Sequence, residues 1–143
     1  MTDKSTGGAA AVIASVLLLA ACGCQSKAHS PAGRHPQIGW RPIGTWSGRG
    51  DSQTDSFIIE GTQWRIKWQT KGAASPGAGS FHLVVHSAVS GRPIYDAVQH
   101  QGDGHGVAYV NEDPRLYHLV IDSAGVDWSV AVEEAVVGEV QSP

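Results

Sequence analysis

Short stretches of alternating apolar and polar residues recur along the chain between residues 43 and 137. Trp64-Arg65-Ile66-Lys67-Trp68 places three apolar residues on one face and two basic residues on the other. The same period of two occurs over 81–86, 117–121 and 128–132. Because successive side chains of a β-strand point to opposite faces, this period predicts half-buried strands. Weaker strands are expected over 43–49, 53–60, 93–99 and 105–111.

Turn-forming residues separate these stretches, and no stretch keeps a helical period for three turns. Gly61, Gly91, Gly102 and Gly125 each lie between two predicted strands. Turn signals spaced about 8–12 residues apart are typical of β-sandwiches and barrels. We therefore expect residues 43–137 to form an all-β domain, a jelly-roll-like antiparallel β-sandwich of about eight short strands. Its predicted core includes the in-phase tryptophans Trp64, Trp68 and Trp128.

An uncharged run precedes the first cysteine. The thirteen residues Ala9 to Ala21 contain neither charge nor proline. This run is too short for a membrane span of about 20 residues but suits the apolar region of a secretory signal. Leu19-Ala20-Ala21-Cys22 resembles the lipobox of bacterial lipoproteins, in which a small-residue cleavage site directly precedes a cysteine. The resemblance implies that residues 1–21 are removed as a lipoprotein signal peptide. It also implies that Cys22, acylated with chains such as palmitate, anchors the mature protein.

The composition changes after the signal. Residues 22–42 are rich in Ser, Pro, Gly and Ala without apolar period, which predicts a disordered tether, and residues 138–143 are predicted to form a disordered tail. The tether contains Lys27, Arg34 and Arg41, whereas residues 43–137 contain six Lys or Arg against eleven Asp or Glu, a net charge of −5. This split favours a domain held off an anionic membrane surface, although charges in a linker also serve solubility alone. The acidic domain argues against nucleic-acid binding, which favours a basic face.

A family resemblance extends over residues 43–134. It rests on Trp46-Ser47-Gly48-Arg49-Gly50, on the Trp64–Trp68 stretch, on Leu116-Tyr117-His118-Leu119-Val120-Ile121 and on Val126-Asp127-Trp128-Ser129-Val130. This order resembles small secreted β-sandwich domains of the pre-peptidase C-terminal and CUB-like types. The resemblance implies a non-catalytic accessory domain and transfers no site residues.

The residues that carry metal and redox chemistry do not form a recognisable motif. Cys22 and Cys24 are the only cysteines, so we expect no disulfide framework. Cys24 has three open fates: acylation, pairing between chains, or a free thiol. Among the seven histidines, His100 and His105 approach Asp103 around a predicted turn, but their spacing requires no metal. We therefore expect neither a metal nor another cofactor.

Two functional hypotheses remain. Because no nucleophile elbow, phosphate-binding loop or zinc-protease motif occurs, we expect no enzymatic activity. The first hypothesis is a lipid-anchored accessory module on the extracytoplasmic side of the cell membrane or the outer membrane, with an envelope protein as its partner. The alternative is a lipoprotein that binds a glycan or another small ligand. Its predicted ligand-binding residues are the exposed Trp40 and Trp46 together with His100, Asp103 and His105.

Overall fold

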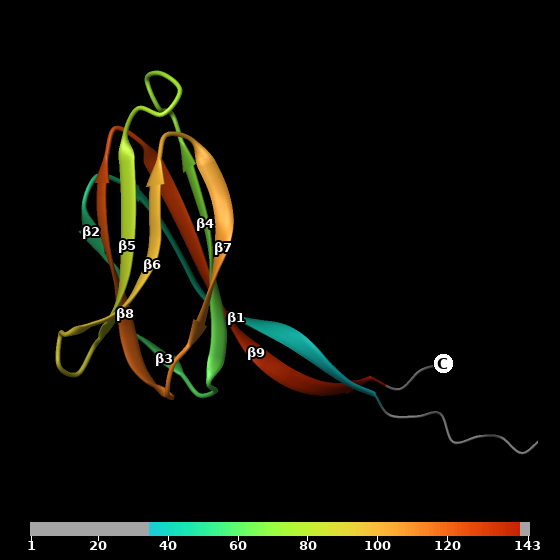
Figure 1. Cartoon of the computed structure of the whole chain (residues 1–143). Helices are drawn as coiled ribbons and strands as arrows, with labels where there is room; N and C mark the ends of the chain where they lie inside the picture. The colour runs from blue at the N-terminus through green and yellow to red at the C-terminus, as the bar shows by residue number, and fades with distance from the viewer. Residues whose placement is uncertain (1–34, 141–143) are drawn as a thin grey trace, which may run out of the picture. The chain divides into compact units, whose positions relative to one another are not determined.

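The computed structural model describes residues 35–140, which form nine β-strands and no helix (Figure 1). The strands are β1 (His35–Arg49), β2 (Ser52–Gln53), β3 (Phe57–Ile59), β4 (Gln63–Lys71), β5 (Ser80–Ser87), β6 (Pro93–Gln101), β7 (Gly104–Asn111), β8 (Arg115–Ala124) and β9 (Asp127–Val140). Every stretch predicted from its alternation forms a strand. The all-β class is thereby confirmed.

The strands form two antiparallel sheets that pack face to face. One sheet has the order β1-β9-β4-β7, and the other has the order β2-β8-β5-β6 with β3 also paired to β8. If β2 and β3 count as one interrupted strand, each sheet has four strands, and the chain passes between them in jelly-roll order. The predicted sandwich is therefore confirmed.

The interruption between β2 and β3 has a local cause. The Thr54 amide donates to the Leu119 carbonyl, and the Leu119 amide donates to the Thr54 hydroxyl, each at 3.0 Å. The hydroxyl thereby accepts the bond that a backbone carbonyl would accept in a regular ladder. One strand predicted over 53–60 therefore becomes two short strands.

The apolar face of each alternating strand is buried between the sheets. Trp64, Phe81 and Tyr117 are among the largest fully buried side chains, and Trp128 is also buried. Trp68 is half-buried and packs against this core, with its ring centroid 5.9 Å from that of Phe81. The three predicted core tryptophans therefore all contribute to one aromatic-rich core.

The first and last strands are longer than composition predicted. β1 begins at His35 and β9 ends at Val140, so residues 35–42 belong to the sheet rather than to a tether. β4 pairs with β9 only as far as Glu134, whereas β1 continues to pair as far as Val140. The excess forms a two-stranded ribbon, residues 35–40 with 135–140, that extends beyond the sandwich (Figure 1). The predicted boundaries at 42 and 138 are thus wrong because backbone pairing continues through residues of low apolar content.

The predicted signal peptide, Cys22 and the first part of the tether lie outside the described residues. Within 35–140, no helix is long and apolar enough to cross a membrane.

Candidate functional site

The outer face of the β1-β9-β4-β7 sheet carries several apolar side chains where polar ones are usual. Arg65 on β4 pairs in register with Glu133 on β9 and with Tyr109 on β7, and all three point away from the core. Trp40 on β1 pairs with Ala135, two residues along β9 from Glu133 and therefore on the same face. The apolar members of this face are Ile38, Trp40, Val107, Tyr109 and Val137, which we call the apolar platform.

The Trp40 ring on edge strand β1 lies close to side chains of β4 and of the opposite edge strand, β7. The guanidinium carbon of Arg65 lies 4.0 Å from the centre of the Trp40 ring, and the Tyr109 ring centroid lies 6.0 Å away at an interplanar angle of 57°. A cation over an aromatic face stabilises an exposed site by about 0.5–1 kcal/mol. The indole is half-buried, whereas 57% of Tyr109 remains exposed. The pair presents a fixed aromatic surface to solvent.

Charges beside the aromatic rings are largely paired. The Arg65 Nε donates to the Glu133 carboxylate at 2.6 Å, and the Lys67 Nζ donates to the same group at 3.3 Å. Burial raises the pKa of Glu133, but the hydrogen bonds from Arg65 and Lys67 outweigh it, so that the pKa lies below its ordinary value. Glu133 is therefore ionised at neutral pH, and this cluster carries a net charge of +1.

A shallow hollow of about 400 Å³ lies on the same face. Its polar lining side chains come from three strands: Lys67 and Gln69 from β4, His105 from β7 and Ser129 from β9. Val107 lines it as well and so joins the hollow to the apolar platform. This face therefore combines a flat aromatic surface with nearby hydrogen-bonding groups.

The five residues predicted for ligand binding do not lie in one site. Trp40 lies on the apolar platform, and His105 lines the hollow on the same face. Trp46 is instead half-buried against the core, with its ring centroid 5.5 Å from that of Phe57. The expectation of an exposed Trp46 is therefore wrong: its position in β1 directs the indole between the sheets.

The side chains of His100 and Asp103 make different contacts, although the His100 Nε2 lies 3.3 Å from the Asp103 carbonyl oxygen. The His100 ring lies 4.9 Å from that of Trp68, and Asp103 accepts a hydrogen bond of 2.8 Å from the Ala73 amide. Asp103 thus holds the loop between β4 and β5. Within residues 35–140, no group of three or more His, Cys, Asp or Glu side chains is placed to hold a metal ion.

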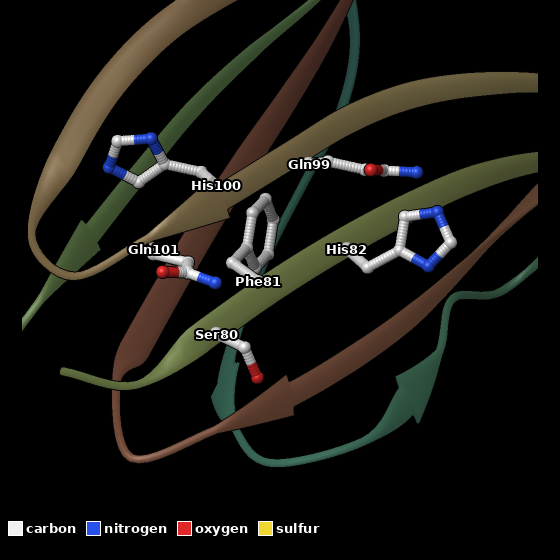
Figure 2. Close-up of a pocket in the computed structure, with 6 residues that line it drawn as sticks. All are labelled: Ser80, Phe81, His82, Gln99, His100 and Gln101. Carbon is white, nitrogen blue, oxygen red and sulfur yellow. The ribbon is translucent and has the colours of Figure 1, made fainter. Parts of the chain in front are cut away.

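A second depression, of about 580 Å³, lies where β5 meets β6 and is lined by Ser80, Phe81, His82, Gln99, His100 and Gln101 (Figure 2). Its two histidines project to opposite sides of the Phe81 ring in that view. His82 pairs with Asp96 at 2.9 Å, on the outer face of its sheet. The depression therefore does not bring its histidines together as acid and base.

Apart from Trp40, the members of the apolar platform were not among the predicted ligand-binding residues. Tyr109, Val107 and Arg65 alternate in phase with the solvent-facing residues of their strands, and that phase was the available signal. Ile38 fell within the segment expected to be disordered, and Val137 was the last residue of the predicted domain, so that their pairing was not anticipated.

Comparison of the chain with protein-family models, with curated proteins and with solved structures returns no match.

Proposed function

We propose that the protein is a lipid-anchored cell-envelope lipoprotein whose β-sandwich is a non-catalytic binding module. The observation that carries this proposal is the uncharged run from Ala9 to Ala21 followed directly by Cys22. Acylation at Cys22 would hold the module at the extracytoplasmic surface of the cell membrane or outer membrane, because two or more acyl chains anchor a protein stably.

The apolar platform supports a protein partner in the envelope. Ile38 and Val137 face outward from the two-stranded ribbon and are 63% and 77% exposed. An isolated two-stranded ribbon is marginally stable in water, so an apolar partner surface stabilises it on contact. Trp, Tyr and Arg, the residue types of Trp40, Tyr109 and Arg65, are also enriched at the centres of protein interfaces.

Crosslinking in the native envelope tests this proposal. The tagged protein is extracted from membranes, and copurifying proteins are identified for the wild type, Cys22→Ala and the double variant Trp40→Ala/Tyr109→Ala. We expect one partner with the wild type, its loss with Cys22→Ala, and binding about 30-fold weaker with the double variant. Tyr95→Ala is the matched control, because Tyr95 is an exposed aromatic residue on β6 of the other sheet.

Two results would contradict the proposal. If Cys22 carries no palmitate label in metabolically labelled cells, the protein has no lipid anchor at this residue. Equal recovery of the partner with the double variant and with Tyr95→Ala shows that the apolar platform is not the binding surface.

The second candidate function is glycan or small-ligand binding. The observation that favours it is the Trp40–Tyr109 pair beside a hollow lined by Lys67, Gln69 and His105, since flat aromatic rings stack on sugars. Envelope oligosaccharides titrated against the same variants distinguish the two candidates. Saturable sugar binding that the double variant loses, with no protein partner in the crosslinked sample, favours the glycan function.

A further inference from the structure

Two histidines face each other on the outer surface of the five-stranded sheet. His86 on β5 and His118 on β8 are direct cross-strand partners, and both alternate with residues that point into the core. Their ring centroids lie 5.3 Å apart with an interplanar angle of 36°. Direct cross-strand pairing brings side chains on one face of a sheet into contact range. The backbone therefore fixes two imidazoles side by side.

The hydrogen bond that His86 makes determines which of its nitrogens is free. Its Nδ1 lies 3.0 Å from the Gly91 carbonyl oxygen. A carbonyl oxygen only accepts, so Nδ1 carries the proton and the neutral ring keeps its lone pair on Nε2. Metal-bound histidines characteristically donate their other ring N–H to a carbonyl or carboxylate, which orients the ring. His86 already has this arrangement.

His118 provides a second imidazole with unsatisfied hydrogen-bonding capacity. The residue is only 7% exposed, and its buried Nδ1 makes no hydrogen bond within the described part of the chain. A buried nitrogen without a partner destabilises the fold, so a ligand that binds at this nitrogen gains binding energy. Burial, together with the adjacent His86, lowers the pKa of His118.

We propose that His86 and His118 form a two-histidine binding site for Zn²⁺ or a related late first-row divalent ion. Neutral imidazole is a preferred ligand of these ions, and Zn²⁺ is commonly four-coordinate. Since no third His, Cys, Asp or Glu joins the pair within residues 35–140, water or a partner's group would fill the remaining positions. The site is on the sheet opposite the apolar platform and does not depend on the proposed anchoring or partner.

His82 provides a matched control on the same strand and the same face. Its Nε2 pairs with Asp96 at 2.9 Å, and its Nδ1 lies 3.8 Å from Asp122. It therefore faces carboxylates rather than a second imidazole, and it is partly exposed as His86 is. Replacing His82 removes one histidine from the chain without changing the proposed pair.

The test is a Zn²⁺ titration of the full chain in detergent, followed by calorimetry and competition with a chelator of known affinity. We expect His86→Gln and His118→Gln each to weaken one Zn²⁺ site at least about tenfold, whereas His82→Gln leaves it unchanged. In the wild type, Zn²⁺ should also shift the ¹⁵N resonances of His86 and His118 and raise the melting temperature.

Equal Zn²⁺ stoichiometry and affinity in the wild type and in His86→Gln would overturn the proposal, as would resonance shifts confined to other histidines. His86 is only partly buried, so His86→Gln remains informative even where His118→Gln does not fold. Failure of this test leaves the envelope-crosslinking result unaffected, because that experiment probes the other sheet and the acylated cysteine.

Discussion

Glu134 is a buried carboxylate whose hydrogen bonds connect three segments. It is 2% exposed, accepts a hydrogen bond of 2.5 Å from the Arg41 guanidinium, and accepts another of 2.8 Å from the Glu60 amide. The Gly61 amide donates to the same carboxylate. Burying a charge is costly unless it is paired and hydrogen-bonded, and here both conditions hold. The residue thus joins β9 to β1 and to the turn before β4.

Replacing Glu134 with Gln should lower the free energy of unfolding by about 3 kcal/mol at pH 7. The amide group of Gln places an N–H against either Arg41 or the turn amides, so one of these donors loses its acceptor. Urea denaturation followed by tryptophan fluorescence measures the change. Glu60→Gln is the control: Glu60 also contacts Arg41 but is exposed, and its replacement should cost less than about 1 kcal/mol.

The contribution of Glu134 to stability should decrease at low pH. Burial raises the pKa of its carboxyl, but the hydrogen bonds from Arg41 and the two amides outweigh it, so that the pKa in the folded state lies below the ordinary value of 4.5. A lowered pKa in the folded state contributes stability above the unfolded value and loses it as the pH falls through the folded value. The difference in the free energy of unfolding between the wild type and Glu134→Gln should therefore become smaller below about pH 4.5. A difference that increases below this pH would contradict this explanation.

At the scale of elements, the long loop between β4 and β5 depends on a glycine that packs against another turn. Gly79 has a φ of +82°, and a Cβ at this position would lie 2.8 Å from both the Ala124 carbonyl oxygen and a Val126 methyl. The loop therefore requires glycine both for its backbone conformation and for the close approach of the β8–β9 turn.

Gly79→Ala should consequently destabilise the fold more than Gly77→Ala. Gly77 has a similar φ of +76° but no atom within 4 Å of an added Cβ, so its replacement costs only the left-handed strain of about 1–2 kcal/mol. We expect Gly79→Ala to add a steric cost of similar size, because backbone atoms of Ala124 cannot move aside. Thermal unfolding of both variants measures the difference. Equal losses would show that the contact with the β8–β9 turn relaxes freely.

The sequence predicted most strands because burial on one face imposes a period of two. Arg65 and Lys67, between tryptophans that fill the core, show this most clearly. The same reasoning predicted residues 43–49 of β1 but missed residues 35–42, where Pro36, Gly39 and Pro42 interrupt the pattern while the backbone still pairs with β9. The apolar platform was not predicted for a related reason. A period of two shows which residues of one strand face outward, but it does not show which strands lie side by side in the sheet.

At the scale of the whole molecule, the position at which the folded domain begins follows from contacts between its first and last strands. Residues 35–40 pair only with the end of β9, whereas Arg41 reaches Glu134 inside the sandwich. Composition favoured a boundary at residue 43, which would exclude Trp40 and Arg41 from the domain. Hydrogen bonding places both within it, and the two boundaries predict different stabilities for shortened chains.

A chain that lacks residues 1–34 should therefore keep the stability of the full chain, whereas one that lacks residues 1–42 should lose about 3 kcal/mol or more. The second removal leaves the Glu134 carboxylate without Arg41 and leaves the end of β9 without a partner strand. Urea midpoints for the two chains measure this, and Arg41→Gln in the chain beginning at residue 35 separates the ion pair from the ribbon. If the chain beginning at residue 43 were as stable as the longer one, neither the ribbon nor the Arg41–Glu134 ion pair would contribute to the free energy of unfolding. The unchanged stability of the shorter chain would then place the start of the autonomous domain at residue 43.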